Sequence, residues 1–449
     1  MDFDVIILAG GLGTRLRPIV GVVPKCLAPI AGRPFLAWLL AWLKPLGPGR
    51  VVLSVGYLHE AVEAWARENA RDYPFEFIFS VEDEPLGTGG GIHLALGRCS
   101  FDKVLIINGD TFFNVDLSLF STASRGPVSI ALKPMEDFDR YGEVVIDGEG
   151  RITAFREKTH CPSGLINGGI YLADRTFLLS LMSSLPQRFS FEKDVLEPLA
   201  GSRDGTVPAG NASTNPPFAP LSPSLPLSVG DSGSSLHRAP PVLTTGRQGS
   251  LEAGPRRNGC ITGVVCDNYF IDIGVPEDYA RAEKELPQVA EIMKVAEKAA
   301  RYETVFLDRD GVINRQIVGD YVRKWEDFEF LPGVFDFFRK IAGSRVLVVT
   351  NQRGVGRGLM SEDDLRDIHG RMVAGIEAHG GKVDGIYYCI SSDPDDPCRK
   401  PAIGMFLQAK KDWPDIDPRT SVMVGDGDVD RDFAAACGMD FIRVGENGE

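Results

Sequence analysis

The sequence predicts an α/β protein with two doubly wound, Rossmann-like domains. The chain has 449 residues, which exceeds the size of one ordinary hydrophobic core. In both halves, short apolar runs rich in β-branched residues alternate with helical patterns, as in a parallel sheet covered by helices. One run in each half ends in a distinctive turn: a glycine-rich loop follows Leu8, and two carboxylates follow Leu307. Two domains are therefore expected, each with a site at the end of a strand.

The composition excludes several classes of partner. The net charge is −14 and the isoelectric point is near 5.1, whereas a protein that binds nucleic acid or an anionic membrane normally has the opposite sign. Neither partner is expected, so local basic residues and metal ions must hold any anionic substrate. The eight cysteines form no disulfide framework and no signal peptide precedes them, which favours the reducing cytoplasm. The most hydrophobic segment, residues 35–46, is too short to span a bilayer.

The first strand is predicted over residues 4–8, and a glycine-rich loop follows it. Glycines remove side chains where the backbone turns, so that N–H groups can face an anion; here they are Gly10, Gly11 and Gly13. Arg15 and Lys25 add the positive charge that a triphosphate requires. The spacing differs from that of a P-loop and from that of a dinucleotide-binding turn.

The next elements alternate between helix and strand. Apolar residues surround the helix predicted to start at Pro34, so that helix should be covered on most sides. A strand over 51–55, a helix over 60–69 and a strand over 75–80 follow. Residues 82–91 form a second glycine-rich turn. Two such turns at the carboxyl ends of neighbouring strands would form the walls of one crevice.

Two carboxylates in the first half are candidate metal ligands. Asp110 follows a buried strand over 104–107, and Asp272 lies within an apolar run over 270–274. An acidic residue at a strand end beside a phosphate-binding loop suits Mg²⁺, which prefers oxygen ligands. Taken alone, Asp110 is more typical of a turn aspartate that caps its own backbone than of a metal ligand.

Six segments together resemble the nucleotidyltransferases that join a nucleoside triphosphate to a sugar 1-phosphate: residues 8–25, 85–91, 108–110, 157–158, 167–169 and 270–279. The resemblance implies that Arg15 and Lys25 hold the triphosphate and stabilise the departing pyrophosphate, and that Asp110 and Asp272 bind Mg²⁺. It implies a nucleotide contact by Leu8 and by the glycine loop, with Gly87 and Thr88 near the base. The sugar phosphate would be received by Glu157, Lys158 and Asn167.

Residues 85–91 are most similar to the mannose- and heptose-1-phosphate guanylyltransferases, so GTP is the expected substrate, with other nucleoside triphosphates left open. In-line attack of the sugar-phosphate oxygen on the α-phosphorus needs no covalent intermediate. Positioning and charge neutralisation would supply most of the catalysis.

The helical pattern is interrupted from about residue 200 to residue 258. This segment is rich in proline, serine, glycine and threonine, and its few apolar residues have no sustained period. It is predicted to be a disordered, low-complexity insertion between a helix over 189–199 and a strand over 261–273. Helical patterns follow over 276–286 and 288–301. The expected domains are therefore 1–286 and 303–449, with a connecting helix over 287–302.

The second half begins with a strand over 304–307 that ends in Asp308 and Asp310. Side chains two residues apart on an extended chain share a face, and Gly311 allows a turn after them. One carboxylate could attack phosphorus while the other gives a proton to the leaving oxygen. A calcium-binding loop is the alternative, but the remaining loop ligands are absent from the sequence.

Three later features resemble the haloacid-dehalogenase phosphatases. They are Thr350 and Asn351 after a strand over 345–349, the pair Arg399–Lys400, and an acidic cluster over 425–430 after a strand. The resemblance implies that Asp308 is the nucleophile and that Asp310 is the general acid and then the base. Thr350 and Lys400 would neutralise the phosphoryl charge. Mg²⁺ would be held by the side chains of Asp308 and Asp426 and by the main-chain carbonyl of Asp310.

The same resemblance implies that Asp430 orients the metal ligands or Lys400. Little chain separates Asp310 from Thr350, or Thr350 from Lys400, so a large cap domain has no room and a capless fold is expected. Residues 314, 321, 328–333, 351–352, 357 and 387–389 look like the D-glycero-D-manno-heptose 1,7-bisphosphate phosphatases, to which histidinol-phosphate phosphatase is closely related. Asn351 and Arg399 would then contact the substrate. That subfamily often binds structural zinc through four ligands. Cys389 and Cys398 remain here, but serine and aspartate occupy the other two positions, so zinc is not expected and residues 391–397 should be held by turns.

Together the two resemblances predict a bifunctional enzyme of nucleotide-sugar synthesis. The second domain would remove the C7 phosphate of a heptose 1,7-bisphosphate, and the first would transfer GMP from GTP to the resulting heptose 1-phosphate. One alternative is a transferase for mannose or another hexose 1-phosphate beside a general sugar-phosphate or histidinol-phosphate-like phosphatase. Another is a binding protein that senses nucleotide sugars with degenerate sites, against which the intact charged residues argue. The oligomeric state is left open.

Overall fold

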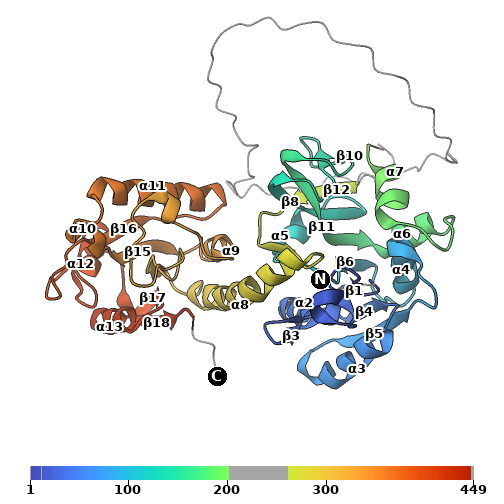
Figure 1. Ribbon diagram of the computed structural model, residues 1–449, viewed down its shortest axis with the longest axis horizontal. Coiled ribbons are helices and arrows are strands. Elements are labelled where there is room, and N and C mark those ends of the chain that lie inside the picture. The colour runs from blue at the N-terminus through green and yellow to red at the C-terminus, as the bar shows by residue number, and fades with distance from the viewer. Residues whose placement is uncertain (1, 12, 202–260, 446–449) are drawn as a thin grey trace, which may run out of the picture.

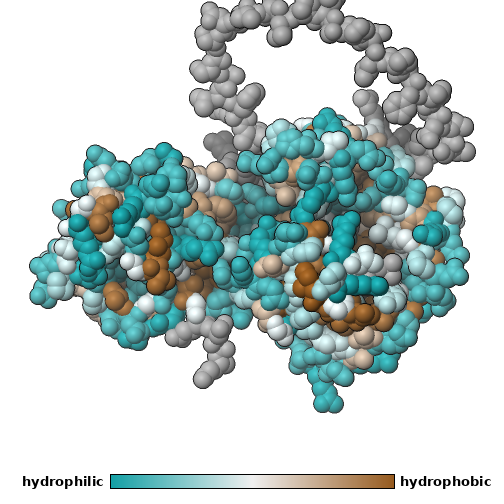
Figure 2. Space-filling model, viewed as in Figure 1, coloured by the Kyte–Doolittle hydropathy of each residue, from teal (hydrophilic) through white to brown (hydrophobic). Residues whose placement is uncertain are grey.

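The computed structural model describes residues 2–11, 13–201 and 261–445. Two α/β domains lie side by side, and the long helix α8 (Pro276–Ala299) runs between them (Figure 1). Both present a mainly hydrophilic face with smaller hydrophobic patches (Figure 2). None of the helices in these ranges is long and apolar enough to cross a membrane. The predicted insertion over about 200–258 lies outside the described residues, except for its first two.

The first domain is built on a seven-stranded sheet with the order β12-β8-β11-β6-β1-β4-β5. Four strands are parallel: β1 (Asp4–Leu8), β4 (Arg50–Val55), β5 (Glu76–Val81) and β6 (Lys103–Asn108). Buried apolar residues fill β1, β4 and β6 as the sequence predicts, whereas those of the edge strand β5 are half-buried. The sheet is not parallel throughout, because β11 (Cys161–Asp174) runs antiparallel to β6 and to β8 (Val128–Phe138). At the other edge, β12 (Ile261–Val265) pairs with β8.

The helices of this domain cover the two faces of the sheet (Figure 1). The predicted apolar helix is α2 (Phe35–Leu43), in which every residue except Ala41 and Trp42 is buried. The others are α1 (Arg17–Val20), α3 (His59–Asn69), α4 (Gly87–Leu96), α5 (Leu117–Ala123) and α6 (Arg175–Met182), followed by a π-helical turn over Glu192–Leu196 that leads into α7 (Glu197–Leu199). The smaller strands are β2 (Pro29–Ile30), β3 (Arg33–Pro34), β9 (Val144–Ile146) and β10 (Ile152–Phe155).

The structure corrects the prediction for residues 82–91, which are not a single glycine-rich turn. Gly87–Leu96 is helix α4, so the glycines occupy its first turns. Their function there is close packing: a Cβ on Gly89 would collide with the ring of Phe189, and one on Gly91 would lie 2.6 Å from Glu82 Oε1. The two glycine-rich segments also do not follow neighbouring strands, because β4 lies between β1 and β5.

A second correction concerns residues 261–273, predicted as one strand. They form two, β12 and β13 (Phe270–Asp272), which belong to different sheets. Strand β13 pairs with β7 (Thr111–Phe113), so that Asp272 lies opposite Thr111 and next to Asp110. The chain leaves the large sheet at residues 267–269 because these residues bond to the second domain, as described below.

The second domain has a fully parallel five-stranded sheet with the order β16-β15-β14-β17-β18. Its strands are β14 (Thr304–Leu307), β15 (Arg345–Asn351), β16 (Gly385–Cys389), β17 (Ser421–Gly425) and β18 (Asp440–Arg443). Its helices are α9 (Val334–Lys340), α10 (Arg353–Gly356), α11 (Glu362–Ala378), α12 (Gly404–Asp412) and α13 (Asp428–Cys437). The central strands β14, β15 and β17 therefore deliver the predicted site residues to one edge of the sheet.

Helix α8 is continuous, although the sequence predicts two helical segments separated at Pro287. The proline lies inside the helix. Buried residues continue on both sides of it: Leu286 and Val289 pack in the core of the first domain, and Ile292 and Val295 pack in the core of the second. Because both cores bury one stripe of the same helix, packing outweighs the hydrogen bond that proline removes. The division at 286, 287–302 and 303 remains our proposal for the domain boundaries.

Candidate active sites

In the first domain, Lys25 lies between two carboxylates. Its Nζ is 2.5 Å from Asp110 Oδ2 and 3.8 Å from Asp272 Oδ1. Lys25 begins a short 3-10 turn, and the glycine loop passes against it: Gly13 has a φ of +58°, and a Cβ there would lie 3.3 Å from that of Lys25. A side chain at position 13 would be strained and crowded, so glycine is required for the loop to approach the lysine.

The electrostatics of this group suit a divalent cation. Burial raises the pKa of Asp272, and the charge of Asp110 raises it further, while Lys25 opposes both effects. Two carboxylates that repel each other in a partly buried position are stabilised by positive charge. Hard oxygen ligands of this kind fit Mg²⁺, so the residues present agree with the predicted cation.

The other residues of the predicted nucleotide site line the same edge. Arg15 is exposed on the loop that follows β1, and Leu8 is half-buried at the end of that strand. The glycine loop lies against the segment before α4, because a Cβ on Gly10 would be 3.5 Å from Glu82 Oε1. Gly11 is exposed on the same loop. The two glycine-rich segments therefore lie close together, although β4 separates their strands, and the crevice between them stays a prediction.

Gly87 and Thr88 contact the segment before the π-helical turn. Gly87 has a φ of +75°, and a Cβ there would lie 2.6 Å from the carbonyl oxygen of Phe189. The Thr88 hydroxyl oxygen accepts a hydrogen bond of 3.0 Å from the backbone N–H of Phe191. Packing alone thus explains the glycine, and the contact of both residues with a base stays a prediction.

The predicted sugar-phosphate residues lie near one helical segment. Glu157 and Lys158 are exposed between β10 and β11. The Asn167 amide donates a hydrogen bond of 2.9 Å to Glu192 Oε1. The pKa of nearby Glu197 is raised, first by burial and then by the negative charges of Glu157 and Glu192. Asn167 also donates to the Tyr171 hydroxyl and accepts from the Gly169 N–H. Sequence reasoning missed Glu192, because 25 residues separate it from Asn167.

In the second domain, buried Lys400 joins two carboxylates. Its side chain is 2% exposed, and Nζ lies 2.9 Å from Asp308 Oδ1 and 2.6 Å from Asp430 Oδ1. Burial alone would lower the pKa of Lys400, but the two aspartates reverse this effect and raise it. Asn351 fixes the lysine backbone: its Oδ1 accepts from the Lys400 N–H at 3.0 Å and its Nδ2 donates to the Lys400 carbonyl at 3.1 Å. Asn351 therefore already bonds at both ends.

Asp308, Asp426 and Asp430 offer carboxylate oxygens within 4.8 Å of one another. Burial raises the pKa of Asp308 and of Asp426, and the charge of Asp430 adds to each shift. Gly311, with a φ of +84°, lets the loop approach, because a Cβ there would collide with the Asp426 carboxylate. A cation would relieve this crowding of negative charge, so the group fits Mg²⁺.

Asp310 is held by Arg309, Asn314 and Gln352. The Arg309 Nη2 donates to Asp310 Oδ1 at 2.9 Å, and Asn314 and Gln352 each donate to the carboxylate at 2.9 Å. Burial would raise the pKa of Asp310, but Arg309 and these hydrogen bonds lower it overall. Gln352 also donates to the hydroxyl of buried Thr350 at 2.8 Å, which links the acid to the predicted phosphoryl contact.

Arg309 and His369 support the carboxylate of Asp310, and the sequence patterns predict neither residue as part of the site. Arg309 is fully buried, and its Nη1 lies 3.3 Å from His369 Nε2 on α11. Burial, and then the charge of Arg309, lowers the pKa of His369 to about 3. The neutral ring can therefore accept a hydrogen bond from the guanidinium. A single histidine in a helical pattern gives no signal of this contact.

His369 should make the second domain sensitive to mild acid. Its pKa is about 3 in the folded protein against an ordinary value of 6.5, so the unfolded chain binds a proton first as the pH falls. The contribution of His369 to stability is therefore complete above about pH 6.5 and decreases toward pH 3, by about 2 kcal/mol between pH 7 and pH 5. Asp308 acts in the opposite direction, because burial raises its pKa and the folded protein binds that proton first. Urea unfolding at both pH values should therefore show a less favourable change in stability on acidification for the wild type than for His369→Gln. Equal changes in both proteins would contradict the assignment.

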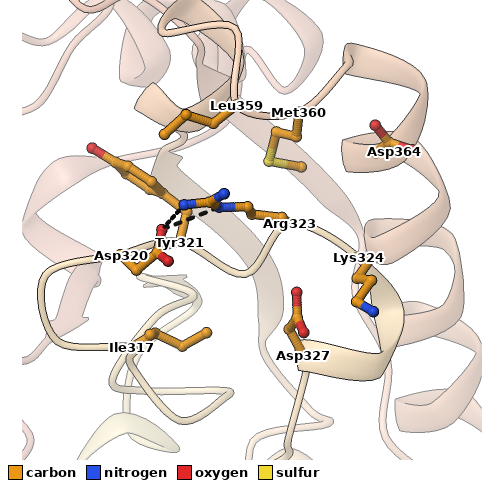
Figure 3. Close-up of a pocket in the computed structure, with 9 residues that line it drawn as sticks. All are labelled: Ile317, Asp320, Tyr321, Arg323, Lys324, Asp327, Leu359, Met360 and Asp364. Carbon is orange, nitrogen blue, oxygen red and sulfur yellow. Dashed lines mark hydrogen bonds and ion pairs between the residues drawn. The ribbon is translucent and has the colours of Figure 1, made fainter.

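A cavity of about 510 Å³ in the second domain is lined by the 317–327 segment, by residues 359–360 and by Asp364 on α11, and by none of the predicted catalytic residues (Figure 3). Tyr321 and Met360 line it and also pack against Gly354, four residues after Thr350. Its charged residues have both signs, and Arg323 pairs with Asp320 at its rim. The full lining is Ile317, Asp320, Tyr321, Arg323, Lys324, Asp327, Leu359, Met360 and Asp364. Such a surface suits a hydroxyl-rich ligand better than an apolar one.

The loop before Lys400 is held by turns, as the sequence predicts. Ser391 Oγ accepts from the Asp393 N–H at 3.2 Å, and Asp396 Oδ1 accepts from the Cys398 N–H at 2.8 Å. Cys389 is buried, and burial raises its pKa. The Arg399 guanidinium lies 3.4 Å from the Ser392 carbonyl, so it too contacts this loop.

Comparison with known proteins agrees with both resemblances. The model of the nucleotidyl transferase family matches residues 4–289, and that of polynucleotide kinase 3 phosphatase matches residues 305–444. A D-glycero-α-D-manno-heptose 1-phosphate guanylyltransferase of Aneurinibacillus thermoaerophilus is 35% identical over 63% of this chain and 98% of its own length. One from Campylobacter jejuni is 40% identical over 43% of this chain and 84% of its own length.

The second domain has its own relatives. A D-glycero-α-D-manno-heptose-1,7-bisphosphate 7-phosphatase of Mycobacterium bovis is 43% identical over 31% of this chain and 75% of its own length. The predicted α/β fold and the two enzymatic activities are thereby confirmed. The chain is a fusion that belongs to the nucleotidyl transferase family through its first domain and to the haloacid-dehalogenase-type phosphatases through its second.

Proposed function

We propose that this protein converts a D-glycero-α-D-manno-heptose 1,7-bisphosphate into GDP-heptose in two steps. The observation that supports it is the presence of two charged clusters, Lys25–Asp110–Asp272 and Asp308–Lys400–Asp430, in one chain. The Mycobacterium bovis relative of the second domain is named for removing the C7 phosphate, and the Aneurinibacillus thermoaerophilus relative of the first domain is named for using the resulting 1-phosphate. The α anomer stands in both of these names, whereas a phosphatase relative from Rhodopseudomonas palustris is named for the β anomer. One domain would thus make the acceptor that the other consumes.

In the phosphatase step, an Asp308 carboxylate oxygen attacks phosphorus and the bond to the C7 oxygen breaks. Asp310 gives the leaving oxygen its proton; the dianionic phosphate beside it favours the protonated acid. Asp310 then takes a proton from water, which attacks the aspartyl phosphate and releases phosphate. Lys400 and Thr350 neutralise the phosphoryl oxygens, and Asp430 and Asn351 hold Lys400 in place. The lowered pKa of Asp310 in the free protein suits its second role, as a base.

In the transferase step, the oxygen of the sugar phosphate attacks the α-phosphorus and pyrophosphate leaves. Arg15 and Lys25 hold the triphosphate and stabilise the leaving group, with the glycine loop offering backbone N–H groups. Glu157, Lys158 and Asn167 receive the acceptor. Asp110 and Asp272 in this domain, and Asp308, Asp426 and the Asp310 carbonyl in the other, would hold Mg²⁺, which supplies charge neutralisation at the phosphoryl oxygens when bound.

Three assays on the full chain test the proposal. The protein with Mg²⁺ and heptose 1,7-bisphosphate should release one phosphate. With Mg²⁺, GTP and heptose 1-phosphate it should release pyrophosphate and form GDP-heptose. Mannose 1-phosphate in place of heptose 1-phosphate tests the main alternative: a higher kcat/KM with mannose 1-phosphate, or with another nucleotide than GTP, would replace the sugar or base named here.

Zinc is expected to be absent from the purified protein. Two thiolates, a hydroxyl and a carboxylate make a poor tetrahedral zinc site, and the turns at Ser391 and Asp396 already order the loop. Elemental analysis should find much less than one zinc per chain, and EDTA should abolish both activities until Mg²⁺ is restored. Stoichiometric zinc, with loss of thermal stability on chelation, would contradict this expectation.

A further inference from the structure

The two domains meet at a buried carboxylate, Asp336 on α9. It is 4% exposed and accepts four hydrogen bonds. Its Oδ2 accepts from Asn114 Nδ2 at 2.7 Å and from the Tyr269 N–H at 3.1 Å, and its Oδ1 accepts from Asn268 Nδ2 at 2.9 Å. The fourth donor is Arg339, on the same helix. Three of the four donors therefore belong to the first domain.

These donors lie at the end of the ribbon formed by β7 and β13. Asn114 directly follows β7, Tyr269 directly precedes β13, and the Asn114 N–H donates to the Tyr269 carbonyl at 2.9 Å. At the opposite end of the ribbon, Asp272 pairs with Thr111, which follows Asp110. Asp336 thus joins the two strands at one end, and the candidate cation ligands lie at the other.

A ribbon of two three-residue strands has little stability of its own. A slip by one residue would turn the side chain of Asp272 to the opposite face. One buried carboxylate that accepts from the main chain of one strand and from the residue after the other opposes such a slip. Its hydrogen bonds are charge-assisted and protected from water, which makes them stronger than those between neutral groups.

The surrounding contacts hold the same loop. The Arg339 Nη2 donates to the Asp267 carbonyl at 2.8 Å, and the Asp267 carboxylate lies 2.6 Å from Lys133 Nζ and 3.4 Å from His379 Nε2. This explains why the chain departs from the predicted single strand over 261–273. Residues 267–269 turn out of the large sheet to meet α9 and the end of α11.

We propose that Asp336 is a positioning residue for the transferase site, so that the phosphatase domain completes the geometry of the transferase cation centre. The proposal rests on the proposed function only in that Asp110 and Asp272 must serve the transferase. It adds a dependence between the domains: the first needs the second for its own chemistry, whereas the phosphatase carboxylates lie on other strands and need no such contact.

The test uses Asp336→Asn in the full chain, which keeps the shape but removes the charge and turns an amide toward one donor. The Mg²⁺ concentration for half-maximal transferase activity should rise about tenfold, as is typical when a group that orients a metal ligand is lost. Phosphatase kcat and KM, measured on the same preparation, should stay unchanged. Hydrogen exchange in residues 266–273 should become faster. Asn114→Ala, made from the other domain, should give the same shift and decides the matter if Asp336→Asn does not fold.

Asp363→Asn is the matched control, because it makes the same change of charge on an exposed residue of the second domain and leaves every donor to Asp336 in place. It should leave the Mg²⁺ dependence of the transferase as in the wild type. An unchanged Mg²⁺ dependence in Asp336→Asn, or an equal shift in Asp363→Asn, would overturn the proposal. Failure of the proposed function is distinct from both, since it would show as absence of transferase activity in the wild type.

Discussion

Replacement of Asp308 by asparagine should abolish phosphate release from heptose 1,7-bisphosphate while leaving the transferase active. Asparagine keeps the size and the hydrogen bond to Lys400 but is not a nucleophile, so the aspartyl phosphate cannot form. The expected loss in kcat is about 10³-fold or more. It is measured as phosphate release by the full chain, beside GDP-heptose formation from heptose 1-phosphate and GTP.

Asp363→Asn serves as the control, because it makes the same change of charge on an exposed residue of the second domain. It should release phosphate at the wild-type rate. If Asp308→Asn retained phosphate release, direct attack by water would replace the covalent mechanism.

Replacement of Asp110 by asparagine should have the complementary effect. Asp110 is bonded to Lys25 and repels Asp272, so its charge sets both the position of the lysine and the affinity of the group for a cation. Loss of that charge should lower transferase kcat/KM by about 100-fold, which corresponds to about 3 kcal/mol of transition-state stabilisation. Pyrophosphate release measures it, with phosphate release from the bisphosphate as the internal standard.

Asp137→Asn is the control for this variant, because Asp137 is an exposed aspartate of the same domain. A transferase that tolerated the loss of Asp110, or a phosphatase that decreased with it, would show that Lys25, Asp110 and Asp272 are not the transferase centre.

Short-range patterns in the sequence predict most of the fold and the positions of the candidate site residues at the strand ends. Strand β1, helix α2 and strand β15 follow from local apolar periodicity, and strand ends place Asp110, Asp308 and Thr350 correctly because parallel strands end at a common edge. The sequence also predicts the glycine loop, since glycine is required at position 13, where the chain passes Lys25.

Contacts between distant residues could not be predicted in this way. Arg309 and His369 are 60 residues apart, and Asn114 and Asp336 are 222 apart, so no local pattern links either pair. The same limit explains the break in the strand over 261–273, which depends on the second domain. It also explains α4: its glycines fit closely against residues of the 187–191 segment, whereas the sequence alone suggests a turn.

The most direct test is a single incubation of the full chain with Mg²⁺, GTP and D-glycero-α-D-manno-heptose 1,7-bisphosphate, in which phosphate, pyrophosphate and sugar nucleotide are followed together. We predict that phosphate appears first, that pyrophosphate and GDP-heptose follow in equal amounts, and that Asp308→Asn forms GDP-heptose only when heptose 1-phosphate is supplied. Phosphate release without any sugar nucleotide, or a nucleotide sugar that retains the C7 phosphate, would contradict the two-step order.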